Sequence, residues 1–200
     1  MVITYHGNGC FRIQSGPLSL LIDPQNARMK PDILLRTLSP WPLKEEEPSA
    51  AEAKEDKSEG REIVGPGEYE LKGVHILGFP VREETSEKFL KTMYVVEVEE
   101  FRLAFLGYLS SIPKPEAFEE FGDIDILFIP ASGKPLLSAE AAARIVKQLS
   151  PKIVIPSFMK SPKEFAKELG QSAAEPGEKL TIKKKDLPPS GPKVVALRES

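Results

Sequence analysis

One order of elements occurs twice along the 200-residue chain, and this repetition limits the possible folds more than any other feature. Each copy has a β-hairpin, a polar connection and a continuous apolar strand introduced by an aspartate, Asp32 in the first copy and Asp125 in the second. The expected strands are residues 10–14, 18–22 and 33–35 in the first copy, and 93–98, 101–106 and 125–128 in the second. The hairpins also share the alternation of apolar residues that buries one face of a strand. The sequence therefore predicts two structurally related halves.

Helices are expected mainly in the second half of the chain. Ser138 can cap a helix in which apolar residues recur every three or four positions. A second helix is expected to start with the capping box at 161–164, which has proline at the first helical position, and Gly170 can end that helix after Leu169. A short buried strand, 153–155, lies between them. Helices alternating with strands after the hairpins indicate an α/β sandwich.

Composition and charge narrow the class of protein. With 40% apolar residues the chain can bury one sizeable core, so we expect a single domain over residues 1–200. The net charge of −3 gives no general attraction to nucleic acid, and none is expected as a partner. Cys10 is the single cysteine and cannot close an intrachain disulfide. No apolar run reaches about 18 residues, so we expect a cytoplasmic protein without a membrane span.

The segment 44–62 differs from the rest of the chain because it contains no Leu, Ile, Val or aromatic residue. It is rich in Glu, Lys, Ala and Ser and cannot bury an apolar face. We expect a mobile charged loop or a solvated helix within the domain, and an acidic docking segment is the alternative.

Six short motifs follow one another along almost the whole chain. They are ITYHGNGCF at 3–11, LIDP at 21–24, GPGEYE at 65–70, FLGYL at 105–109, DIDILFIP at 123–130 and PKIVIP at 151–156. Together they resemble the metallo-β-lactamase-fold hydrolases, and in particular their lactonase-like Zn-dependent hydrolase branch. The resemblance implies an αββα sandwich of the metallo-β-lactamase type, whose internal repeat agrees with the two related halves.

The resemblance also implies a His-x-His-x-Asp-His motif after the first buried strand, where imidazoles and a carboxylate hold zinc and activate water. The matching positions of this chain are Leu38, Pro40, Pro42 and Leu43. None of these side chains can donate to a metal ion. The primary metal motif of the family is therefore absent from this sequence.

The remaining ligand positions of the family have also changed. Tyr108 stands where the resemblance places a bridging aspartate, and Phe158, next to Ser157, stands where it places a histidine. The mid-chain histidine falls at or near Arg82, and Asn8 replaces a histidine often found after the first glycine. Since every expected donor is lost, the chain is identified as a degenerate member of the family that folds without metal.

Two hypotheses describe what replaces the metal site. Arg36, Trp41, Arg82 and Tyr108 could converge on one rim of the cleft and bind an anionic or planar ligand. Alternatively, Trp41 and Phe158 fill the vacated cavity. The residual polar candidates for another chemistry are His6, Asp23 and Glu68.

Those polar candidates have structural interpretations of their own. His6 is expected in a solvated or capped turn after the first strand, and His75 on a solvated strand face. Asp23 and Glu68 are expected to bind backbone amides in turns rather than to act as an acid and base pair.

The main hypothesis is a metal-free, non-catalytic protein that acts as a binding or assembly module, without cofactor, paired with an identical chain or a catalytic paralogue. The alternative is a hydrolase of ester, lactone or phosphoester substrates. It would use displaced zinc, or a metal-free site around His6, Asp23 and Glu68. The sequence names neither ligand nor partner.

Overall fold

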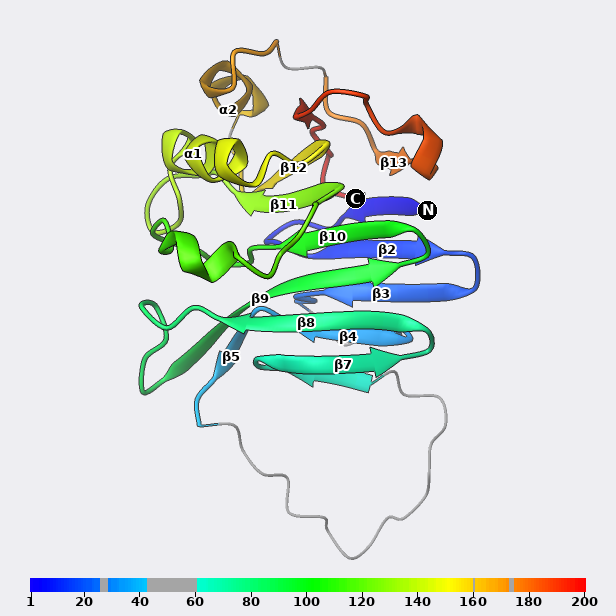
Figure 1. Ribbon diagram of the computed structural model, residues 1–200, viewed down its shortest axis with the longest axis vertical. Helices are drawn as coiled ribbons and strands as arrows, with labels where there is room; N and C mark the ends of the chain where they lie inside the picture. Colours follow the sequence, from blue (N-terminus) through cyan, green and yellow to red (C-terminus); the bar gives the residue numbers. More distant parts are fainter. Residues whose placement is uncertain (26–28, 43–60, 160, 173–174) are drawn as a thin grey trace, which may run out of the picture.

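The computed structural model describes residues 1–25, 29–42, 61–159, 161–172 and 175–200 of the chain. Two β-sheets pack face to face, and the helices lie beside one of them (Figure 1). The predicted α/β sandwich is therefore confirmed. Both described α-helices pack on the larger sheet, and no described α-helix packs on the smaller one.

The smaller sheet has six strands in the order β13-β1-β2-β3-β4-β6. Their bounds are Lys179–Thr181 for β13, Val2–Tyr5 for β1, Phe11–Ser15 for β2, Leu18–Ile22 for β3, Ile33–Arg36 for β4 and Arg61–Val64 for β6. The two strands of the predicted first hairpin, β2 and β3, pair antiparallel, and β4 then runs parallel to β3.

The larger sheet has eight strands, seven of them in the order β14-β12-β11-β10-β9-β8-β7, while β5 pairs with β9. Their bounds are Lys193–Val194 for β14, Ile153–Ser157 for β12, Ile126–Pro130 for β11, Phe101–Phe105 for β10, Phe89–Val98 for β9, Val74–Pro80 for β8, Gly67–Leu71 for β7 and Leu38–Pro40 for β5. The hairpin β9–β10 is antiparallel, and β11 runs parallel to β10.

The two halves repeat the same hydrogen bonds at the start of their buried strands. The Asp32 carboxylate accepts from the backbone amide of Ser19 at 2.8 Å, and the Asp125 carboxylate accepts from that of Arg102 at 2.8 Å. The backbone amides of the two aspartates donate in turn to the carbonyl oxygens of Ser19 and Arg102, each at 2.9 Å. The predicted repetition is therefore present in the backbone, with one aspartate joining each hairpin to its parallel strand.

The main core lies between the sheets and consists of alternate residues of the facing strands. Representative side chains are Ile13, Leu20 and Leu35 from the smaller sheet and Val96 and Phe105 from the larger one. A second apolar cluster lies on the outer face of the larger sheet, beneath the helices. The larger sheet is therefore buried on both faces over much of its area.

The helices cover that outer face. The first, α1 (Ala139–Leu149), is capped by Ser138 as predicted, since its side chain accepts from the amide of Ala141 at 3.2 Å. The second, α2 (Pro162–Glu168), has the predicted proline in its first turn. However, Ser161 makes no capping hydrogen bond, so the predicted capping box is wrong. Gly170 follows α2 in a left-handed conformation, with φ 69°.

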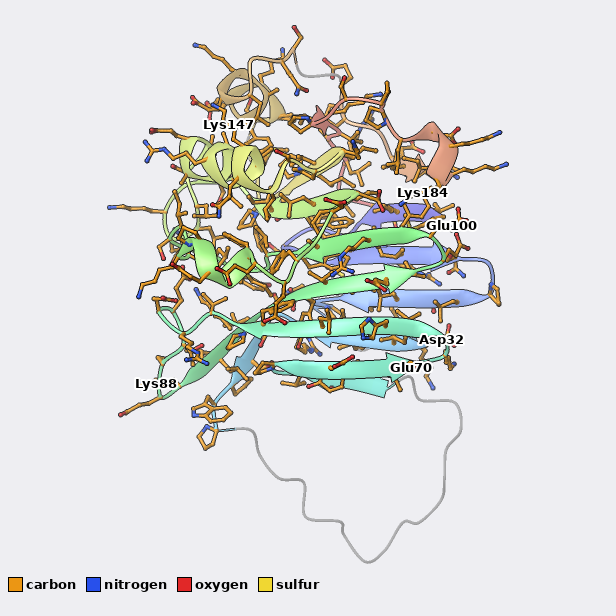
Figure 2. The ribbon with its side chains drawn as sticks, viewed as in Figure 1. Asp32, Glu70, Lys88, Glu100, Lys147 and Lys184 are labelled. Carbon is orange, nitrogen blue, oxygen red and sulfur yellow. The ribbon has the colours of Figure 1, made fainter. Side chains whose placement is uncertain are left out.

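Short one-turn helices complete the described elements, η1 (Pro115–Phe118) before β11 and η2 (Lys184–Asp186) after β13. Figure 2 shows Lys184 near Glu100, and the Lys184 ammonium group donates to the Glu100 carbonyl oxygen at 2.7 Å and to the Asp125 carboxylate at 2.6 Å. This contact joins the C-terminal segment to the second aspartate of the repeat.

The predicted charged loop is shorter than expected. Its last two residues, 61 and 62, belong to β6, which pairs parallel with β4. Strand pairing thus extends into the polar stretch because Ile63 follows and enters the core. Residues 44–60 lie outside the described part of the chain. Within that part, no helix is long and apolar enough to cross a membrane.

Candidate functional site

Three loops meet at one end of the sandwich, where the family's metal site is expected. They follow β1, β10 and β12 and carry Gly9, Tyr108 and Phe158. The Phe158 ring lies against Gly9, so that a Cβ atom at Gly9 would be 2.6 Å from the ring Cζ atom. Gly9 also has a φ of 79°, which favours glycine. The glycine therefore leaves the space that the phenylalanine ring fills.

Tyr108 packs beside Phe158 and forms the second aromatic wall. The two ring centroids are 5.2 Å apart with an interplanar angle of 56°. The Tyr108 hydroxyl donates to the carbonyl oxygen of Asn8 at 3.0 Å, which joins the loop after β10 to the loop after β1. Burial raises the pKa of Tyr108 to about 12, so the phenol stays protonated near neutral pH.

Tyr5 is the third aromatic residue of the site, at the end of β1. Its hydroxyl accepts from the backbone amide of Phe158 at 3.2 Å. Phe158 has a left-handed backbone, with φ 58°, which is unusual for a large side chain. The hydrogen bond from its amide helps to hold this conformation and directs the ring toward Gly9.

A cavity of about 600 Å³ opens between these loops. Its walls are mainly aromatic and apolar, with three polar residues. The lining residues are Tyr5, Asn8, Tyr108, Ser132, Pro135, Leu136, Phe158, Met159, Leu197 and Glu199. A volume of this order suits a small organic ligand.

Behind Phe158 the interior is almost closed. A cavity of about 10 Å³ remains there, lined by residues that include Asp23, Phe105, Gly107 and Ser157. A volume this small holds at most one water molecule. The aromatic residues therefore separate the outer cavity from the core of the sandwich.

Asp23 lies at the inner end of the site and is 4% exposed. Its carboxylate accepts from the backbone amide of Thr37 at 2.8 Å and also from the Thr37 hydroxyl. Burial raises the pKa of Asp23 to about 6, although these hydrogen bonds oppose the shift. The predicted role of Asp23, binding a backbone amide, is confirmed.

An ion pair between Lys91 and Glu84 holds the loop that carries Tyr108. The Lys91 ammonium group lies 2.7 Å from the Glu84 carboxylate and donates to the Tyr108 carbonyl oxygen at 2.8 Å. The same carboxylate accepts from the backbone amides of Ser110, at 2.9 Å, and Ser111, at 2.7 Å. Burial raises the pKa of Glu84, but these donors outweigh it, so the pKa lies below its ordinary value.

The predicted convergence of Arg36, Trp41 and Arg82 with Tyr108 is wrong. The Arg36 guanidinium group is held by Glu62 at 2.7 Å and by the Pro24 carbonyl oxygen at 2.8 Å. Arg82 is exposed and lines a different depression, together with η1. Only Tyr108 of this group lines the cavity beside Phe158.

Trp41 does not fill the vacated cavity, although Phe158 does. Trp41 is 44% exposed, and its backbone amide donates to the Lys88 carbonyl oxygen at 2.8 Å. Figure 2 shows Lys88 at the outer edge of the molecule. The chain leads Trp41 outward because β5 pairs antiparallel with the start of β9.

The first two of the four positions matched to the family's zinc motif lie in a strand rather than in a loop. Leu38 and Pro40 are the first and last residues of β5, and Pro42 follows as an exposed residue. Leu43 lies outside the described residues. Ser157 is buried at the end of β12, where it lines the small inner cavity.

The residual polar candidates are not brought together. His6 contacts the hydroxyl groups of Thr4 at 3.2 Å and Ser200 at 3.0 Å, as expected for a turn histidine. The prediction that Glu68 binds a backbone amide in a turn is wrong for the described residues. Its exposed carboxylate lies instead 2.9 Å from the His75 ring, on the strand pair β7–β8. The two strands pair in a register that places Glu68 and His75 on one solvated face.

The described side chains at the expected metal site do not form a set of zinc ligands. In the part of the chain that the structure describes, no group of three or more His, Cys, Asp and Glu side chains could hold a metal ion. The Asp23 carboxylate lines the small inner cavity, and Thr37 donates to both of its oxygens. The other positions carry the aromatic side chains of Tyr108 and Phe158, which are not zinc ligands.

Sequence reasoning missed several residues that build this site. Glu199 and Leu197 reach the cavity from the C-terminal segment, which pairs with the end of β1 through Tyr5 and Glu199. Glu84 and Lys91 had no motif to mark them. The alternation of polar residues in β9 gave no sign that Lys91 turns inward to a carboxylate.

Comparison with known proteins agrees with this fold. The profile of the β-lactamase superfamily domain matches residues 2–157. A UPF0173 protein of Pyrococcus furiosus is 28% identical over 216 residues, which cover 94% of this chain and 97% of that protein. A UPF0173 metal-dependent hydrolase of Pyrococcus abyssi is 27% identical over 145 residues, or 64% of each chain.

Solved structures show the same architecture at lower identity. A candidate Zn-dependent hydrolase of the metallo-β-lactamase superfamily from Thermotoga maritima matches with a TM-score of 0.76 and 23% identity, over 98% of this chain and 97% of its own. The metallo hydrolase Igni18 of Ignicoccus hospitalis matches with a TM-score of 0.67 and 17% identity, over 91% and 98%. With a family profile that spans most of its length and a shared two-sheet architecture, this chain belongs to the β-lactamase superfamily.

Proposed function

We propose that this protein is a metal-free member of the β-lactamase superfamily that binds a small organic ligand in the cavity lined by Tyr108 and Phe158. The observation that carries this proposal is the Phe158 ring against Gly9, at a position where the family resemblance places a metal ligand. Tyr108, which packs on Phe158, likewise occupies the position at which the family resemblance places a bridging aspartate. Aromatic walls have thus taken the place of donors and shape an open cavity.

A binding role agrees with how the site is held. Hydrogen bonds from Tyr108 to Asn8 and from Phe158 to Tyr5 join the loops, and the Glu84–Lys91 ion pair fixes the Tyr108 loop. Such a preformed site loses little conformational entropy when a ligand binds. None of these contacts needs a metal ion to hold the loops in place.

A second candidate function is metal-dependent hydrolysis of ester, lactone or phosphoester substrates, with zinc or another metal at a displaced position. The names of relatives favour it: the Pyrococcus abyssi protein is a metal-dependent hydrolase, and the Thermotoga maritima structure is described as a candidate Zn-dependent hydrolase. For this chain, hydrolysis would require donors other than Leu38, Pro40, Tyr108 and Phe158.

Metal content separates the two functions. The protein, purified without an affinity tag and dialysed against zinc, is analysed by elemental mass spectrometry, with the Pyrococcus abyssi relative as a control. We expect essentially no bound zinc and the same thermal unfolding with and without a chelator. About one or two zinc ions per chain, with unfolding at lower temperature after chelation, would overturn the proposal. Turnover of ester, lactone or phosphodiester substrates would do the same.

Ligand binding is tested directly with a fragment library of mixed charge, observed by NMR. We expect weak binders that shift the signals of Tyr108 and lose about tenfold in affinity in Phe158→Ala. Phe89→Ala is the matched control, because Phe89 is 48% exposed and lines no part of the cavity. A library without binders, or equal effects of the two variants, would contradict a binding role for this cavity.

A further inference from the structure

The cavity has a charge character that its lining residues define. Three aromatic side chains, Tyr5, Tyr108 and Phe158, share its wall with one carboxylate, that of Glu199. No lysine or arginine is among the described residues that line it. Glu199 is therefore the one formally charged side chain among the described lining residues.

The aromatic rings are arranged so that a cation could contact them. The Tyr108 and Phe158 rings are tilted at 56° with their centroids 5.2 Å apart, and the Tyr5 hydroxyl contacts the Phe158 amide. The face of an aromatic ring carries partial negative charge and attracts a cation that lies within about 6 Å of its centre. Three aromatic side chains line this one cavity, so a cationic ligand in it would lie beside their rings.

Glu199 supplies the formal charge of the site. Its side chain is exposed, and its carboxylate lies over Gly7, where a Cβ atom would be 2.2 Å from the Oε1 atom. Gly7 has a φ of 80°, which favours glycine. The neighbouring His6 ring contacts Thr4 and Ser200 instead of Glu199.

The Glu199 carboxylate also has no counterion in the described part of the chain, since none of the ion pairs there includes it. Its backbone is nevertheless fixed beside Tyr5 by a parallel bridge. A carboxylate next to aromatic side chains is the arrangement that recognises alkylated ammonium groups.

We infer that the ligand of this cavity is a small organic cation, with a methylated ammonium group between the aromatic rings and Glu199. This inference rests on the proposed binding function. The methyl groups would contact the apolar wall, which includes Leu136 and Met159, while the positive charge faces the carboxylate and the rings. A phosphate would find no basic group among the described residues that line the cavity.

Three probes of the same shape test the charge preference. They are choline, the alcohol in which a tert-butyl group replaces its trimethylammonium group, and the anion of tert-butylacetic acid. Titration calorimetry and the NMR signals of Tyr108 and Phe158 report binding to the full chain. We expect choline to bind about tenfold more tightly than the neutral isostere, and the anion not to bind.

Two pairs of variants assign the effect to the proposed groups. Glu199→Gln should weaken choline binding about tenfold and leave the neutral isostere unchanged, whereas Glu178→Gln, at an exposed acid outside the lining, should change neither. Tyr108→Leu should lose the choline preference, and Tyr108→Phe, which keeps the ring face, should retain it. Circular dichroism confirms that each variant is folded.

The outcomes distinguish this inference from the proposed function. If choline fails to bind, or binds no more tightly than the neutral isostere, the preference for a cation is wrong, while neutral fragments in the cavity still support a binding site. An unchanged affinity in Glu199→Gln also overturns the cation inference. If no fragment of any charge binds in the cavity, the proposed binding function falls, and the cation inference falls with it.

Discussion

The Lys91 ammonium group contacts the Glu84 carboxylate at 2.7 Å, and the two side chains, 18% and 6% exposed, form an ion pair inside the protein. The pair joins the loop after β8 to the loop after β10, because Lys91 also binds the Tyr108 carbonyl oxygen and Glu84 binds the amides of Ser110 and Ser111. Two side-chain charges thus tie these loops together.

Replacing the Lys91 side chain should therefore lower the free energy of unfolding. In Lys91→Met the Glu84 carboxylate stays buried without its counterion, and we expect a loss of roughly 3 kcal/mol in the free energy of unfolding. Arg144→Met is the control, because the exposed pair of Arg144 with Glu140 should contribute less than about 0.5 kcal/mol. Urea unfolding measures both losses, and a similar small loss in both variants would show that the internal pair is not a structural tie.

Because Asp23 is buried, we expect its contribution to the free energy of unfolding to fall as the pH rises. Burial raises its pKa to about 6, whereas an unfolded aspartate titrates near about 3.9. Between these values the folded chain holds a proton that the unfolded chain releases, so the stabilisation is complete below about pH 4 and is lost as the pH rises through about 6. Relative to Asp23→Asn, the wild type should lose roughly 2 to 3 kcal/mol between pH 4 and 7.

Asp32 provides a control, because its contribution to stability changes with pH in the opposite direction. Hydrogen bonds from Lys72 and Ser19 hold the pKa of Asp32 at about 2, so its contribution is present above about pH 4 and is lost as the pH falls through about 2. Relative to Asp32→Asn, the wild type should become more stable as the pH rises over this range. Urea unfolding at several pH values measures both differences, and a pH slope of the same sign for the two aspartates would contradict the assignment.

The contact between Gly9 and Phe158 should make the site intolerant of alanine. Gly9→Ala places a methyl group into the Phe158 ring and also imposes a left-handed backbone on alanine. Gly16→Ala imposes only the backbone term, about 1 kcal/mol, because nothing lies within 4 Å of a Cβ atom there. We expect Gly9→Ala to cost at least about 1 kcal/mol more than Gly16→Ala.

A double substitution tests whether the ring is the cause. Phe158→Ala should remove the extra cost of Gly9→Ala, so that the two changes are not additive in thermal or urea unfolding. Additive losses would mean that Phe158 does not occupy the space above Gly9.

Cys10 should react slowly in the folded protein. It is buried beside the site, and burial raises its pKa to about 11, so little thiolate forms near neutral pH. We expect alkylation by iodoacetamide to be at least about a hundredfold slower in native buffer than in urea. Mass spectrometry follows the reaction over time, and equal rates in the two conditions would contradict the burial of the thiol.

The repetition of the two halves was predictable because it depends on local patterns in the sequence. Alternating apolar residues set the buried face of each hairpin strand, and the aspartates at 32 and 125 bind the backbone of the hairpin before them. Ser138 likewise lies three residues before the amide that it caps. The strand faces and the helix cap depend on local patterns, so spacing was sufficient to predict them, whereas the hydrogen bonds of the two aspartates were found only in the structure.

The sequence also indicated which donor positions had changed, but not what occupies their place. Trp41 and Phe158 were equivalent candidates for filling the cavity, and the pairing of β5 with β9 turns one outward while the φ of 58° turns the other inward. Both outcomes depend on backbone direction at the ends of strands.

The sequence by itself therefore determined many of the strands, the two described α-helices, the repetition of the halves and the residues that stand at the family's ligand positions. Only the tertiary structure decided which side chains form the candidate site, because that site joins loops far apart in the chain. Gly9 meets Phe158 and Tyr5 pairs with Glu199 through the packing of two sheets. Contacts of this kind are set by the relative placement of strand ends in space, which no local pattern of residues specifies.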